Sequence, residues 1–74
     1  MVVTQEDRDK AFEFQYGGAK NCRTIRAART IDTYPQEYSS TQIERANKVI
    51  LAAARKDGKT IAQFTSLADE VNDF

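Results

Sequence analysis

Apolar residues recur at every third or fourth position along most of this chain, and this spacing constrains the fold more than any other feature. Such a period places apolar side chains on one face of an α-helix, whereas a half-buried strand needs alternation at every second position. No alternating run of β-branched and aromatic residues extends beyond a few positions. The sequence therefore predicts an all-α fold, a compact bundle of three or four short helices.

Residues 41–57 form the helix that the sequence predicts most clearly. Thr41 and Glu44 fit a capping box at its start, and Gly58 follows at a position where helices commonly end. Leu51 lies outside the wide arc that holds the other apolar residues of this helix, which are Ile43, Ala46, Val49, Ile50, Ala53 and Ala54.

Residues 61–72 are predicted to form the last helix, with Thr60 and Gln63 as its capping box. Gly58-Lys59 joins it to the preceding helix, so the two are expected to pack as an antiparallel or steeply crossed hairpin. Its apolar residues fall within about 140° of the helical wheel, and they are Ile61, Phe64, Leu67, Ala68, Val71 and Phe74.

Residues 5–16 are predicted to form the first helix. Thr4 and Asp7 resemble a capping box at its start, and Gly17-Gly18 would end it. Phe14 points nearly opposite to the apolar face of this helix, which is formed by Ala11, Phe12 and Tyr16.

Residues 19–31 are predicted to form the second helix, and residues 32–38 the main loop. Pro35 directs the preceding residue away from helical dihedral angles, which places the loop here. The apolar stripe of the second helix is expected to comprise Cys22, Ile25, Ala28 and Ile31.

The apolar content predicts a thin core. Only 15 of the 74 residues are Leu, Ile, Val or Phe, and ten are Ala. A chain this short buries only about 60% of the surface that its unfolded form exposes, although zero net charge opposes disorder. We expect a single helical domain over residues 1–74 that gains stability as a homo-oligomer, through Phe14 or the Ala-rich helix.

The residue types exclude several kinds of site. Because the chain has no His and one Cys, it cannot build a standard zinc site or a Ser-His-Asp or Cys-His centre. Cys22 lies on a predicted apolar stripe, where an inert thiol is usual. Two clusters of acidic residues lie on predicted solvated faces of the first and last helices. They are Asp7, Asp9 and Glu13 in the first cluster and Asp69, Glu70 and Asp73 in the second. Because catalysis by carboxylates requires burial, we expect no enzyme activity, metal or cofactor.

No membrane or secretion signal is expected. The longest apolar run, Val49–Ala54, has six residues, whereas a membrane span needs about 20. The first seven residues lack a basic region followed by an apolar one, and a single cysteine cannot make an internal disulfide. These features predict a cytoplasmic protein.

Basic residues concentrate on two predicted helices, although the net charge is zero. Residues 17–34 carry +3 and residues 45–59 carry +4, and the segments beside them are acidic. One interpretation is a surface that tracks nucleic-acid phosphates. The interpretation that we favour is a solvated face balanced by nearby acids, because nucleic-acid-binding domains usually have a basic excess. The residues concerned are Lys20, Arg23, Arg26 and Arg29 and then Arg45, Lys48, Arg55 and Lys56.

Aromatic residues outside the predicted apolar faces are a second candidate set. Phe14, Tyr34 and Tyr38 could contribute to a protein interface, where aromatic residues are enriched, or the two tyrosines could cover an open end of the core. Ala52-Ala53-Ala54 indicates either helix propensity alone or close packing on more than one side of a helix.

We therefore expect a small intracellular helical regulator that modulates or inhibits a larger protein by direct binding, of the kind that phages and mobile elements direct at a host machine. Its partner would carry an acidic patch that complements the basic helices. Two alternatives stay open: a nucleic-acid-binding regulator that uses the basic helices at 19–31 and 41–57, and a structural subunit of a larger assembly.

Overall fold

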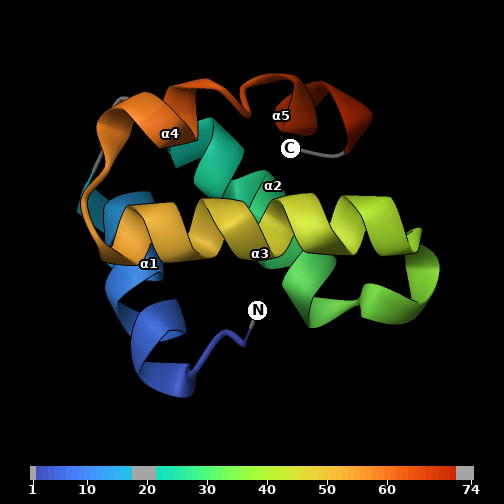
Figure 1. Ribbon diagram of the computed structural model, residues 1–74, viewed down its shortest axis with the longest axis horizontal. Coiled ribbons are helices and arrows are strands. Elements are labelled where there is room, and N and C mark those ends of the chain that lie inside the picture. The colour runs from blue at the N-terminus through green and yellow to red at the C-terminus, as the bar shows by residue number, and fades with distance from the viewer. Residues whose placement is uncertain (1, 18–21, 72–74) are drawn as a thin grey trace.

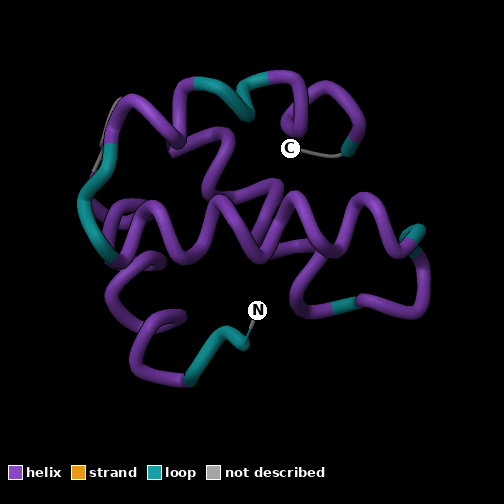
Figure 2. Tube along the Cα trace, viewed as in Figure 1, coloured by secondary structure: helices purple, strands orange, loops and turns teal. Residues whose placement is uncertain are grey.

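The computed structural model describes residues 2–17 and 22–71, and it confirms the all-α class (Figure 1). No strand occurs among these residues, and short loops join the successive helices from α2 to α5 (Figure 2). The radius of gyration is 10.7 Å, close to the roughly 11 Å expected for a compact domain of this length. The elements are α1 (Gln5–Gly17), α2 (Cys22–Thr33), the short 3₁₀ helix η1 (Pro35–Glu37), α3 (Ser40–Ala54), α4 (Gly58–Ala62) and α5 (Ser66–Glu70).

The longest helix, α3, is the centre of the packing. It crosses in front of α1 and α2 in Figure 1, and α4 and α5 lie along one side of it. Ala52 and Ala53 are both buried, and Ala54 is half-buried. Because alanine lets neighbouring backbones approach closely on several sides, the interpretation of the Ala run as a central packing helix is the one that the structure supports.

The core confirms most of the predicted apolar faces. On α2 the buried face is wider than the predicted stripe, since Thr24 and Ala27 are buried with it. This width follows from the position of α2, which packs against α1, α3 and α5 at once. The apolar core residues are Val3, Ala11, Ile25, Ala27, Ala28, Ile31, Ala46, Val49, Ile50, Ala52, Ala53, Ile61, Leu67, Ala68 and Val71.

The placement of Phe14 corrects one prediction. Its side chain is half-buried and packs against the core, as that of Phe12 does, although the two point in nearly opposite directions on the helical wheel. Because α1 contacts both α2 and α3, two sides of this helix face apolar neighbours. Phe14 and the Ala-rich helix therefore contact residues of the same chain. An oligomer would have to use other surfaces or the exposed part of Phe14.

The predicted helix over residues 61–72 is interrupted, and this part of the prediction is wrong. Two five-residue helices, α4 and α5, replace it, with a turn at residues 63–65. In this turn backbone N–H groups donate to the third carbonyl before them, as in Phe64 N to Ile61 O at 3.0 Å and Leu67 N to Phe64 O at 2.9 Å. This tighter winding keeps Ile61 and Leu67 buried but leaves Phe64 only half-buried. Phe74 lies outside the described residues.

The helix N-termini follow the predicted chemistry, but not always at the predicted residues. The Thr4–Asp7 box is confirmed, with both backbone-to-side-chain distances at 3.2 Å. The cap of α3 is Ser39 with Gln42, and the cap of α4 is Asp57, whose side chain accepts from the backbone N–H of Thr60. Several cap-forming residues stand in a row before α3, so the sequence alone does not distinguish between adjacent starts.

Lys56, rather than Gly58, ends α3. It adopts a left-handed backbone conformation with φ of 60°. Its N–H donates to the Ala53 carbonyl at 3.0 Å, and the N–H of Asp57 donates to the Ala52 carbonyl at 2.9 Å, the bonding pattern of a Schellman motif. Gly58 is instead the first residue of α4. A residue with a side chain therefore occupies the position that usually favours glycine.

Lys56→Gly is expected to stabilise the protein. The left-handed conformation costs a residue with a Cβ atom about 1–2 kcal/mol, and the greater entropy of glycine in the unfolded chain offsets about 0.5–1 kcal/mol of that. A rise of a few degrees in Tm should follow in a thermal melt. Lys56→Ala is the control, since it removes the same charge but keeps the Cβ atom. If Lys56→Ala raised Tm equally, relief of backbone strain would not be the cause.

Candidate interaction surface

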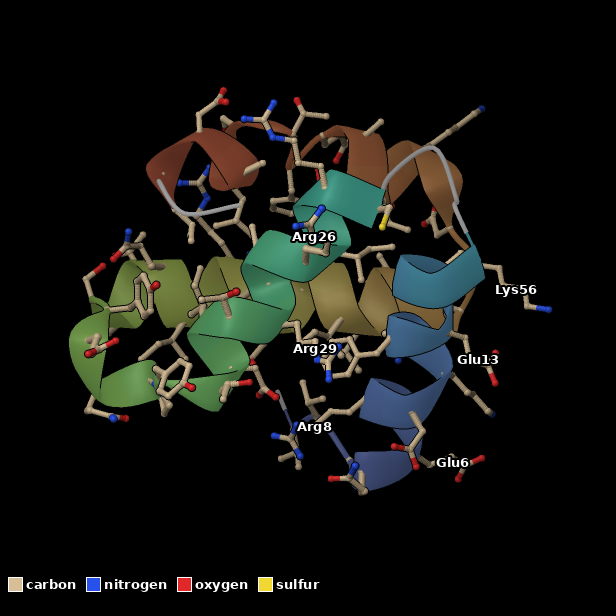
Figure 3. All side chains as sticks on the ribbon, turned by 180° about the vertical axis from the view of Figure 1, so that it is seen from behind. Glu6, Arg8, Glu13, Arg26, Arg29 and Lys56 are labelled. Atoms are coloured by element: carbon tan, nitrogen blue, oxygen red, sulfur yellow. The ribbon has the colours of Figure 1, made fainter. Side chains whose placement is uncertain are left out.

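The basic residues of α2 do not form an open cationic row. Arg23 Nη2 lies 3.7 Å from Asp69 Oδ1 on α5, and both side chains are exposed. The Arg29 guanidinium lies over the ring of Phe12 on α1, 5.4 Å from its centroid. Arg26 and Arg29 lie on the rear face of the molecule (Figure 3). Lys20, the remaining candidate on this segment, lies outside the described residues.

The basic residues of α3 divide into two groups. Arg45 forms an ion pair with Glu70, and its Nη2 donates to Ser66 Oγ at 2.9 Å, so this arginine holds α5 against α3. Lys48 Nζ lies 3.6 Å from Glu44 Oε1 one turn earlier on the same helix. Arg55 and Lys56 are exposed at the C-terminal end of α3.

The two basic helices face different sides of the molecule. In Figure 1 α3 is nearest the viewer, whereas in Figure 3 α2 is in front and Lys56 projects from an edge, away from Arg26 and Arg29. The seven basic candidates that the structure describes therefore do not converge on one surface. The ion pairs of Arg23 and Arg45 with α5 instead match the expectation that nearby acids balance the basic faces.

An ion pair between α1 and α2 was not predicted from the sequence. Arg8 Nε donates to Asp32 Oδ2 at 2.9 Å, and the side chain of Asp32 is 15% exposed. The pair lies in a groove whose other lining residues are mainly polar. The alternating charge of the chain segments was the available signal, but residue 32 was predicted to lie in a loop rather than on α2. Arg8 and Asp32, which line this groove, are therefore already paired with each other.

A second groove lies between α3 and α4, and it combines apolar and basic side chains. Leu51, which the wheel placed outside the apolar arc of its helix, is half-buried here against the core. Phe64, which was predicted to be a core residue, is half-buried on the opposite wall. We call this the α3–α4 groove, and its lining residues are Lys48, Leu51, Ala52, Arg55, Asp57, Thr60 and Phe64.

The one acidic residue that lines the α3–α4 groove, Asp57, is the N-cap of α4. Asp57 accepts hydrogen bonds from the hydroxyl of Thr60 and, at 3.1 Å, from its backbone N–H. These bonds hold the pKa of the Asp57 carboxyl below its ordinary value. The carboxylate therefore stays ionised and engaged at neutral pH, while Lys48 and Arg55 flank the apolar part of the groove.

The other candidates lie apart from this groove. Tyr34 is 51% exposed beside η1, whereas Tyr38 packs against the core, as expected of a residue that covers an open end. Asp7 serves in the cap of α1, Asp9 accepts from Gln5 Nε2 at 3.0 Å, and Cys22 is half-buried at the start of α2. Asp73 lies outside the described residues.

Comparison with known proteins shows no relative: no family model, curated protein or solved structure matches this chain. Within residues 2–17 and 22–71, no helix has the length and apolar character that a bilayer crossing needs. Over the same residues, no three acidic or sulfur-bearing side chains gather in a way that could hold a metal ion.

Proposed function

We propose that this chain is a non-enzymatic binding protein that modulates a larger protein by docking it at the α3–α4 groove. The observation that carries the proposal is the combination found there: half-buried Leu51 and Phe64 between the basic side chains of Lys48 and Arg55. Protein interfaces characteristically place apolar anchors at their centre and polar groups at their rim. An acidic patch on the partner would be the natural complement of this rim.

The size of the groove favours a protein over a small molecule as its occupant. Its volume is about 250 Å³, which is below the roughly 300–1,000 Å³ typical of small-molecule pockets. A groove of this size accepts one or two side chains from a partner. The groove also opens onto a helix end where both Arg55 and Lys56 are exposed, so the partner would meet further positive charge there.

A pull-down with the tagged protein from a nuclease-treated lysate of the native cell is expected to recover a specific protein partner. Leu51→Asp, which places a charge between Lys48 and Arg55, should abolish that capture. The double variant Lys48→Glu/Arg55→Glu should reduce it strongly. Lys59→Glu/Lys10→Glu is the matched control, because it changes the net charge equally with exposed residues that do not line the groove. Capture that is equal for all variants would contradict the proposal.

Any binding of nucleic acid is expected to be weak and independent of sequence. Arg23, Arg45 and Lys48 already lie beside acidic side chains, and the two basic helices face different sides. If about four phosphates were neutralised, the log–log slope of affinity against salt would be about −3.6. Titration of a duplex library at two salt concentrations measures this slope. A single preferred site bound at nanomolar affinity in physiological salt would replace the present proposal with a nucleic-acid-binding function.

A further inference from the structure

The α3–α4 groove has a regular spacing that defines the chemistry of its occupant. Lys48, Leu51, Ala52 and Arg55 lie on one stripe of α3, with the two basic residues at its ends. Arg55 lies seven positions after Lys48, which is about two helical turns and about 10 Å along the axis. Phe64, which belongs to the turn between α4 and α5, forms the wall opposite Leu51.

We infer that the groove binds an amphipathic helix of a partner protein that carries two carboxylates seven residues apart and an apolar side chain between them. This inference rests on the proposed function and deepens it. A helix that lies along α3 repeats the same rise of about 1.5 Å per residue, so its carboxylates at positions i and i+7 meet Lys48 and Arg55 together. Its residues at i+3 and i+4 then face Leu51 and Phe64.

Both basic side chains are available to such a partner. Among the described residues, the ion-pair partner of Lys48 is an exposed residue of its own helix, at 3.6 Å, and an exposed pair of this spacing contributes little to stability. A partner carboxylate can replace it at little cost. Across the described residues, no carboxylate lies within ion-pair distance of the Arg55 guanidinium. Its neighbour in the groove, Asp57, is engaged with Thr60.

A second copy of this chain fits the groove less well. Glu6 and Glu13 on α1 are seven residues apart and both point away from the body of the molecule (Figure 3). The residues between them on that face, however, are Asp9 and Lys10, and Lys10 Nζ lies 3.0 Å from Glu6 Oε1. This face therefore offers a lysine where the groove needs an apolar side chain, and the lysine would oppose Lys48 and Arg55.

The probe is a synthetic helical peptide whose central segment is Glu-Ala-Ala-Leu-Leu-Ala-Ala-Glu, cross-linked on its far face because short isolated helices are marginal in water. In an NMR titration of the full chain, shifts are expected at the amides of Leu51, Arg55 and Phe64. A peptide with the two Glu five residues apart places them on different faces and should bind at least tenfold more weakly. A peptide with Lys in place of Glu should not bind.

Charge reversal tests the pairing directly. Lys48→Glu/Arg55→Glu should lose at least tenfold in affinity for the Glu peptide and gain binding of the Lys peptide, whereas Lys59→Glu/Lys10→Glu should bind the Glu peptide within twofold of the parent. Lys48→Gln/Arg55→Gln serves if the reversed variant does not fold, and it too should bind at least tenfold more weakly. Equal binding of all three peptides, or shifts centred on another surface, would overturn the inference.

Failure of the inference can be told apart from failure of the proposed function. A captured partner that is lost with Leu51→Asp, together with no peptide binding, would keep the proposed function and overturn the helix. If no variant altered capture, the proposed function itself would fail. Concentration-dependent shifts at Leu51 and Phe64 without peptide would identify a second copy as the occupant and overturn the inference.

Discussion

Ile50→Ala should leave much of the chain unfolded at room temperature. The Ile50 side chain is fully buried on α3, which contacts every other long helix. Truncation of a buried isoleucine costs about 2–5 kcal/mol, and the total stability of so small a domain is about 5 kcal/mol or less. Urea unfolding followed by circular dichroism measures the loss.

Phe64→Ala is the informative comparison for Ile50→Ala. The helical wheel placed both residues in the core, but the structure leaves Phe64 half-buried in the α3–α4 groove. Because the Phe64 side chain is only partly removed from water on folding, its truncation should destabilise the chain less than Ile50→Ala does. If both variants melted within a degree or two of the parent, the core assignment itself would be wrong.

Leu67→Ala should have the second largest effect, because burial contributes more than charge to holding α5 in place. A five-residue helix has no stability of its own, and Leu67, which is fully buried, is its main anchor. The expected cost is about 2–5 kcal/mol. The thermal melt should broaden or shift, and amides of α4 and α5 should exchange hydrogen faster than those of α3.

Asp69→Asn provides the contrast on the same helix. It removes the charge that lies 3.7 Å from Arg23, and both side chains of that pair are exposed. Exposed ion pairs contribute about 0–1 kcal/mol, so Tm should fall by no more than a few degrees, and less in high salt. A loss larger than that of Leu67→Ala would mean that α5 is held by charge.

Much of the architecture followed from local features of the sequence. The apolar spacing predicted the all-α class, and the predicted buried positions on α2, α3 and the last segment include Ile25, Ile31, Val49, Ile50 and Leu67. The Thr4–Asp7 box marked the start of α1 correctly. These features are determined within one or two turns of the chain, where periodicity and capping chemistry act.

The features that make up the candidate surface required the tertiary structure. The wheel placed Leu51 outside the apolar arc of its helix and Phe64 within the apolar face of the last segment, and only the turn at 63–65 brings them to opposite walls of one groove. The pairing of Arg23 and Arg45 with α5, and of Arg8 with Asp32, depended in the same way on which helices became neighbours. Local sequence determines which face of a helix is apolar. The crossing of the helices decides which side chains of neighbouring helices meet, because these contacts join residues far apart in the chain.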